Sequence, residues 1–137
     1  MTEHISPDLQ AALICEDVRM EANGGNTLVG VINIIAAPKL PIRVIKLCVF
    51  TRWCSGRGEF LQKTRILDID EEHEIASAEA PFRLKNTENH ATNVNVFGGM
   101  EFRKEGDYPV EICLENDLKL RFTLKIVKMS APQPHHG

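Results

Sequence analysis

Apolar and polar residues alternate with a period of two along most of the chain, which is typical of β-strands that bury one face. Glycine, proline, asparagine and aspartate interrupt the alternation at intervals of about ten residues, as turns do in a sandwich or barrel. No segment combines a helical apolar period with a helix cap. The pattern predicts an all-β fold, an antiparallel β-sandwich of about seven to nine strands that is immunoglobulin-like or another Greek key.

The last two predicted strands show the clearest alternation. Apolar residues occupy every second position of 110–114 and 118–126, and mostly charged residues lie between them. The apolar positions are Val110, Ile112, Leu114, Leu118, Leu120, Phe122, Leu124 and Ile126. Two such strands form a sheet with one apolar side, so a second sheet is needed to cover it.

The earlier strands follow from the same pattern. They are predicted at 11–16, 27–36, 43–53, 60–69 and 74–80, with a short extended piece from Pro81 and a long loop over 86–95. Gly24 lies in the turn between the first two strands, where a glycine is free to adopt a positive φ. The expected organisation is an N-terminal arm at 1–10, a β-sandwich domain at 11–129 and a flexible C-terminal tail at 130–137.

Composition and charge exclude several classes of protein. A chain of 137 residues, 43% of them hydrophobic, suits one globular domain with its own core. The net charge of -3 and the pI near 5.9 argue against a nucleic-acid binder, which needs a basic face. No run approaches the roughly 20 apolar residues of a membrane span, and the first ten residues do not form a signal peptide. We therefore expect a cytoplasmic protein that binds neither nucleic acid nor membranes.

Motifs for catalysis and for metal binding are missing from the sequence. The four cysteines contain no CxxC pair and no Cys/His cluster with zinc spacing. There is no Gly-x-Ser-x-Gly elbow, and no glycine pair has the lysine and following helix of a phosphate loop. The sequence therefore predicts a protein that is not an enzyme and that holds no cofactor and no metal ion.

Two charged blocks each have a functional and a structural interpretation. The carboxylates of Asp68, Asp70, Glu71, Glu72 and Glu74 could bind calcium, but such residues are also typical of a solvated hairpin tip. The lysines and arginines between 39 and 65 could grip a phosphate or an acidic partner, yet a period of two distributes them over both faces. We interpret the basic block as a rim that faces the acidic block of the same or a neighbouring subunit.

Segments near both ends of the chain resemble a known family. The resemblance rests on Leu13-Ile14-Cys15-Glu16-Asp17-Val18-Arg19, Asn23-Gly24-Gly25-Asn26 and Leu28-Val29-Gly30-Val31, and later on Phe102, Gly106, Tyr108, Val110, Ile112 and Asp117. From about residue 13 to residue 129, the sequence is similar to a family of small bacterial proteins of unknown function. This resemblance supports the all-β prediction and implies no catalytic residue. We assign structural roles to Gly24, Gly30, Gly106 and Tyr108.

Gly106-Asp107-Tyr108 also resembles the tyrosine corner of immunoglobulin-like sandwiches. In that corner a tyrosine hydroxyl bonds to the main chain just upstream and holds two strands together. We therefore interpret Tyr108 as a structural residue rather than a binding residue.

One feature of the sequence points to a partner. Both faces of the segment 28–35 are apolar, and the run 44–50 is nearly so, although a sandwich strand normally shows one face to water. A loop from 86–95 or 36–41 could cover the second face, or a second subunit could. We favour a subunit interface, and the candidate interface residues are Val29, Val31, Ile35, Val49, Arg52, Trp53 and Arg57.

These observations predict a non-catalytic protein-interaction or accessory module that self-associates, most simply as a homodimer, and that could bind another protein. The alternative is a small-ligand binder. Its pocket would lie between the sheets or at the loop end near Trp53, Asn93 and Asn95.

Overall fold

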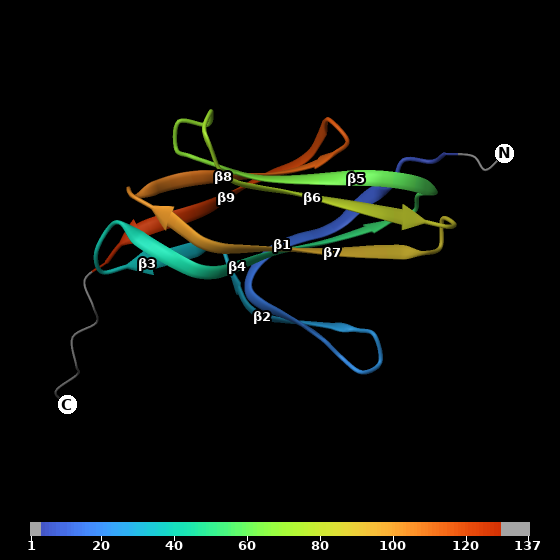
Figure 1. Cartoon of the computed structure of the whole chain (residues 1–137), viewed down its shortest axis with the longest axis horizontal. Coiled ribbons are helices and arrows are strands. Elements are labelled where there is room, and N and C mark those ends of the chain that lie inside the picture. The colour runs from blue at the N-terminus through green and yellow to red at the C-terminus, as the bar shows by residue number, and fades with distance from the viewer. Residues whose placement is uncertain (1–3, 130–137) are drawn as a thin grey trace.

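The computed structural model describes residues 4–129, which form nine β-strands and no helix. The strands are β1 (Asp8–Met20), β2 (Asn26–Ile32), β3 (Ile34–Ala37), β4 (Ile42–Cys54), β5 (Gly58–Leu67), β6 (Glu74–Leu84), β7 (His90–Phe102), β8 (Gly106–Leu114) and β9 (Asp117–Lys128). They form a four-stranded sheet in the order β2-β1-β4-β7 and a five-stranded sheet in the order β3-β9-β8-β5-β6. Figure 1 shows the two sheets as two layers. The predicted all-β fold is confirmed.

Strand pairing is antiparallel with one exception. β3 pairs with β9 in parallel, over Ile34–Ala37 and Lys125–Lys128, so the prediction of a purely antiparallel sandwich was wrong at this position. The predicted strand at 27–36 is divided at Asn33, because β2 belongs to one sheet and β3 to the other. This division also explains why both faces of the segment are apolar, since its two halves pack in different sheets.

The main core lies between the two sheets. Its largest fully buried side chains include Trp53, Phe102 and Tyr108, and Ile35 packs against the same core from β3. Val49 and Trp53 are 0% exposed. The prediction that Val49 and Trp53 form an interface was therefore wrong, because their side chains are occupied within the chain. Ile35 is half-buried, and its part in an interface stays a prediction.

Three local predictions also differ from the structure. β6 continues through Pro81 to Leu84, where an edge strand tolerates a proline. β7 begins at His90, so most of the predicted loop over 86–95 is strand. A bulge between Ile112 and Cys113 places Leu118 opposite Cys113, and Leu118 is 51% exposed. A bulge shifts the alternation by one residue, which removes Leu118 from the apolar face.

Of the residues singled out as structural, Gly24 lies in a turn, Gly30 lies within β2, and Gly106 and Tyr108 lie at the start of β8. Gly24 has a φ of +87° in the β1–β2 turn. Gly30 has a φ of +65°, and a Cβ there would approach the Glu16 side chain to 2.7 Å. Gly106 begins β8 with a φ of +154°. The Tyr108 hydroxyl donates to the carbonyl oxygen of Lys104 at 2.7 Å, which is the bond of a tyrosine corner.

The ends of the chain are described only in part. β1 begins at Asp8, so the last residues of the predicted arm at 1–10 already belong to a strand. The predicted tail at 130–137 lies outside the described residues. Within residues 4–129, no helix is long and apolar enough to cross a membrane.

Candidate functional site: the outer face of the four-stranded sheet

The outer face of the four-stranded sheet carries two rows of mostly apolar side chains. Directly opposed residues of neighbouring strands point to the same face, so the pairing registers define each row. One row runs Val31, Cys15, Cys48, Val96 across β2, β1, β4 and β7, and the next runs Leu13, Phe50, Val94 across β1, β4 and β7. We call these seven residues the valine face.

The valine face is buried at its centre and exposed at its sides. Cys15, Cys48 and Phe50 form a small apolar cluster and are at most 7% exposed. The outer members are exposed, namely Leu13 by 38%, Val31 by 54%, Val94 by 37% and Val96 by 59%. Burial raises the pKa of both the Cys15 and the Cys48 thiol, so these side chains stay neutral and apolar.

Neither of the two loops predicted to cover an apolar face lies on it. Most of the segment 86–95 forms the start of β7, the edge strand of this sheet. Within the segment 36–41, β3 ends in the other sheet. Among the described residues the outer side chains of the valine face therefore remain open to solvent, as their exposure shows.

Part of the inner face beneath the valine face is polar. The Gln62 side chain of β5 lies at the centre of a buried network that joins the two sheets. Its Oε1 accepts hydrogen bonds from Thr51 Oγ1 at 2.6 Å, Trp53 Nε1 at 2.7 Å and Asn93 Nδ2 at 3.0 Å. Its Nε2 donates to Thr64 Oγ1 at 2.8 Å and to Asn95 Oδ1 at 3.2 Å, and Thr64 Oγ1 donates to Asn95 Oδ1 at 2.7 Å.

β7 is therefore inverted relative to an ordinary sandwich strand. Asn93 and Asn95 point to the interior network, whereas Val94 and Val96 point outward. Shifting the register of β7 by one residue would bury the valines and expose the asparagines. The network opposes that shift, because Gln62 and Thr64 would lose their asparagine partners.

Charged groups lie at both ends of the valine face. Arg52 follows Phe50 on the outer side of β4, opposite Ala11 and Thr92. Its Nε is shielded from solvent and has no hydrogen-bond partner among residues 4–129. At the other end Asp17 Oδ1 accepts a hydrogen bond from Lys46 Nζ at 2.7 Å. This bond lowers the pKa of Asp17, which is therefore ionised at neutral pH.

The structure brings together only some of the predicted interface residues. Val31 and Arg52 lie on the outer face, and the half-buried Val29 is opposite Asp17 in the arm formed by β1 and β2. Arg57 lies elsewhere, where its main chain pairs with Ile5. The sequence analysis missed six members of the face, Leu13, Cys15, Cys48, Phe50, Val94 and Val96. The signal for two of them was the Asn-Val-Asn-Val run at 93–96, which alternates but does not say which set is buried.

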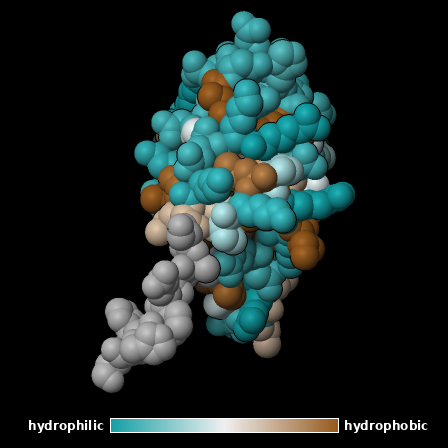
Figure 2. All heavy atoms as spheres, turned by 90° about the vertical axis from the view of Figure 1, so that its left-hand side faces the viewer, coloured by the Kyte–Doolittle hydropathy of each residue, from teal (hydrophilic) through white to brown (hydrophobic). Residues whose placement is uncertain are grey.

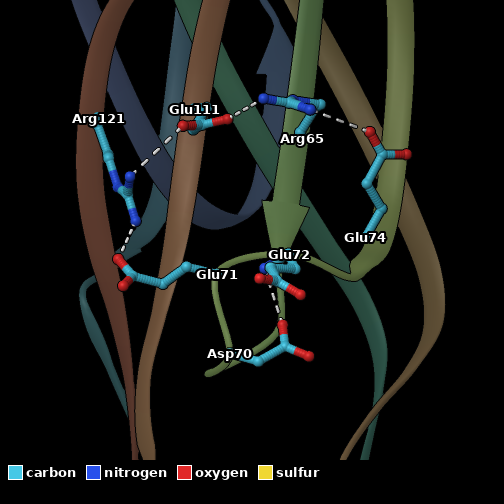
Figure 3. A network of polar contacts seen from close by, with 7 residues as sticks. All are labelled: Arg65, Asp70, Glu71, Glu72, Glu74, Glu111 and Arg121. Carbon is cyan, nitrogen blue, oxygen red and sulfur yellow. Dashed lines mark hydrogen bonds and ion pairs between the residues drawn. The ribbon is translucent and has the colours of Figure 1, made fainter.

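The outer face of the five-stranded sheet is charged instead of apolar. Glu111 of β8 is 5% exposed and lies between Arg65 of β5 and Arg121 of β9. Arg65 continues the row to Glu74 at 3.5 Å, and Arg121 pairs with Glu71. Figure 3 shows Arg121, Glu111, Arg65 and Glu74 as one row across the strands, with Glu71 below the row in the segment that joins β5 to β6. This face resembles a solvated sheet surface more than a docking site.

The end of the molecule seen in Figure 2 also offers no continuous apolar patch. Hydrophilic residues predominate there, and the hydrophobic residues form small separate groups. The valine face, in contrast, is a run of apolar side chains across four adjacent strands.

The acidic hairpin does not converge on a cation. Glu71 and Glu74 pair with arginines, and Asp70 accepts hydrogen bonds from the main chain of Glu72 and His73 and from the His73 ring. No group of three or more histidine, cysteine, aspartate or glutamate side chains within residues 4–129 is arranged to hold a metal ion. The arrangement favours the interpretation of this segment as a charged hairpin tip.

Asp70 and His73 predict a pH-dependent hairpin. Main-chain hydrogen bonds from His73 and Glu72 and the bond from the His73 ring lower the pKa of Asp70 to about 2. The bond to Asp70 raises the pKa of His73 above its ordinary value of 6.5. The Asp70 contribution is present above about pH 4 and is lost as the pH falls towards 2, whereas the His73 contribution is lost as the pH rises through its raised pKa.

Asp70→Asn is therefore expected to bring the pKa of His73 back towards its ordinary value. An NMR titration of the His73 ring protons in the wild-type protein and in the variant measures this change. An unchanged His73 titration in the variant would show that the two side chains do not interact in solution.

A cavity lies at the end of the sandwich away from Trp53. It has a volume of about 620 Å³ and is lined by both acidic and basic groups, with Asp68, Asp70, Glu101, Arg103, Lys104 and Tyr108 among them. Between the sheets, the space next to Trp53, Asn93 and Asn95 is filled by the Gln62 side chain, which bonds to all three. A pocket at the loop end near these residues stays a prediction.

Comparison with known families gives one result. A model for a family of unknown function, DUF6941, matches residues 10–127. The chain belongs to the DUF6941 family. The match spans nearly all of the described strands, so both sheets and the valine face belong to the DUF6941 domain. The resemblance to a family of unknown function is confirmed, and a bacterial origin stays a prediction. A search of curated proteins finds no match.

Proposed function

We propose that this DUF6941 protein is a non-catalytic protein-interaction or accessory module that self-associates as a homodimer through the valine face. Under this proposal it acts in the bacterial cytoplasm, where its four cysteines would remain reduced. We further propose an immunoglobulin-like or related Greek-key sandwich, which the hydrogen bond from Tyr108 to Lys104 supports.

The inverted polarity of β7 and its neighbours carries this proposal. Val94 and Val96 face solvent while Asn95 is 7% exposed in the interior. Exposing valines and burying amides is unfavourable for an isolated chain. A second surface that covers the valines would offset the cost of exposing them, and the polar network fixes which side chains are presented.

The size of the face predicts a weak and reversible dimer. Counted with the charged rows at its two ends, the face has four rows of outward side chains over roughly 20 Å on four strands about 4.8 Å apart, which gives a footprint on the order of 400 Å². Stable interfaces bury about 800 Å² of accessible surface per partner. Figure 1 shows the β1–β2 arm leaving the body on the side away from the five-stranded sheet, so the arm would add contact area beside the face.

Val96→Asp is expected to raise the dimer dissociation constant at least about tenfold, because a carboxylate would be buried against an apolar surface. Sedimentation equilibrium over a range of protein concentrations measures the constant, and circular dichroism checks that the variant is folded. The matched control is Leu118→Asp, since Leu118 is similarly exposed but lies on the other sheet. This control is expected to leave the dissociation constant unchanged.

Two results would overturn the proposal. One is a wild-type protein that stays monomeric up to millimolar concentration. The other is a dimer that Val96→Asp and Leu118→Asp affect equally, because the valine face would then have no special part in association.

A small-ligand function is the second candidate, and the cavity of about 620 Å³ favours it. Its mixture of carboxylates and cationic side chains suits a ligand that carries both charges. Native mass spectrometry of gently purified protein separates the two proposals, since a retained non-protein mass supports the ligand and a bare dimer supports self-association.

A further inference from the structure

The Nε–H of Arg52 has no hydrogen-bond acceptor among the described residues. Arg52 is half-buried at one end of the valine face, and this Nε is shielded from solvent. A shielded donor without an acceptor is uncommon in folded proteins and often marks an absent partner group. Arginine is also a frequent anchor of protein interfaces.

The opposite end of the face offers a carboxylate. Asp17 Oδ1 accepts a hydrogen bond from Lys46 Nζ at 2.7 Å, whereas Oδ2 lies 3.8 Å from Arg19 Nε. The Asp17 side chain is 38% exposed. Its second oxygen is therefore available for a further hydrogen bond.

The symmetry of a dimer decides whether these two ends meet. Two identical sheet faces can be related by a two-fold axis that runs either along the strands or across them. An axis along the strands places the Arg52 end of one copy over the Arg52 end of the other, which brings like charges together. An axis across the strands keeps each strand over its own copy, so Arg52 of β4 lies over the end of the partner's β4 that carries Lys46. There the carboxylate of Asp17, on the adjacent β1, offsets the Lys46 charge.

We propose that the occupant of the valine face is a second copy of this chain, bound about a two-fold axis across the strands, with Arg52 of each copy donating to Asp17 of the other. Arg52 lies on β4 and Asp17 on the neighbouring β1, a lateral offset of about 4.8 Å that an arginine side chain spans. The partner is thus recognised by one apolar face and two identical ion pairs. This inference rests on the proposed function and specifies its geometry.

A double-mutant cycle tests the ion pair. Arg52→Met and Asp17→Asn are each expected to raise the dimer dissociation constant about tenfold, since each removes both copies of one contact. The double variant is expected to dissociate no more readily than either single variant. Arg57→Met is the control, because Arg57 is also cationic but lies away from the face, where its main chain pairs with Ile5.

Mixing the two single variants gives the sharper result. A mixed dimer keeps one of the two contacts, between the unchanged Arg52 of one chain and the unchanged Asp17 of the other. It is expected to form about threefold more tightly than either variant alone. Sedimentation velocity with one variant fluorescently labelled measures the mixed species.

The outcomes separate this inference from the proposed function. If Val96→Asp disrupts the dimer but mixing gives no gain, or if Arg52→Met leaves the dissociation constant unchanged, the two-fold arrangement is wrong and the valine face stands. If the wild-type protein does not associate at all, the proposed function itself fails and this inference with it.

Discussion

Gln62→Leu is expected to lower the free energy of unfolding by about 3 kcal/mol. The substitution removes the acceptor of three hydrogen bonds, from Thr51, Trp53 and Asn93. Each buried donor left without an acceptor costs about 1–3 kcal/mol. Some of this loss is recovered, because Thr51 Oγ1 lies 3.4 Å from the Asn93 carbonyl oxygen and can bond there instead. Urea denaturation at neutral pH measures the change.

The same substitution at an exposed strand position is the control. It measures the effect of replacing glutamine by leucine in a strand without loss of the buried network. Gln10→Leu, on the exposed side of β1, is expected to change the free energy of unfolding by no more than about 0.5 kcal/mol. A Gln62→Leu variant within about 1 kcal/mol of wild type would show that the network does not hold the sheets in register.

The sequence predicts the strands best where each has one apolar and one polar face. The final hairpin shows this, because Val110, Ile112, Leu124 and Ile126 are all buried in the core as their alternation indicates. Leu118 departs from the pattern through a bulge at Ile112 and Cys113. A bulge changes which face of the sheet the following residues point to, but the sequence still alternates between apolar and polar residues on both sides of it. The change of face therefore cannot be recognised from the sequence of the strand.

Segments that are apolar on both faces were predicted less well. The run at 28–35 has the composition of a strand buried on two sides, yet β2 and β3 belong to different sheets and pair in different directions. Local alternation does not encode which sheet a strand joins, because that choice depends on contacts between residues far apart in the chain.

In the candidate site, local alternation likewise does not show which single residues point to the core. On β4 both alternate sets are apolar, and the structure assigns Val49 and Trp53 to the core and Cys48 and Phe50 to the outer face. Polar partners on other strands decide this assignment, since Thr51 and Trp53 must face Gln62. The inward asparagines of β7 follow from the same network. A set of amides that meets only in three dimensions could not be recognised from one strand at a time.

The second large effect is expected on the outer face of the five-stranded sheet. There, removing the cation Arg65 should lower the free energy of unfolding more than removing the anion Glu111. Arg65→Met is expected to lower the free energy of unfolding by about 2–3 kcal/mol. It leaves the Glu111 carboxylate, which is 5% exposed, with only Arg121 Nη1 at 3.8 Å. Glu111→Leu is expected to cost less than about 1 kcal/mol, because the Arg65 and Arg121 side chains are 34% and 40% exposed and water can solvate them.

The two substitutions together test whether desolvation of Glu111 is the cause. In the double variant no carboxylate is left unpaired, so its unfolding free energy is expected to match that of Glu111→Leu, with a coupling of about 2 kcal/mol between the two sites. Arg83→Met, at an exposed position of the neighbouring β6, is the control and is expected to change stability by less than about 0.5 kcal/mol. Equal losses for Arg65→Met and Glu111→Leu would instead mean that the pair contributes through its mutual attraction, since desolvation affects the buried carboxylate far more than the exposed guanidinium groups.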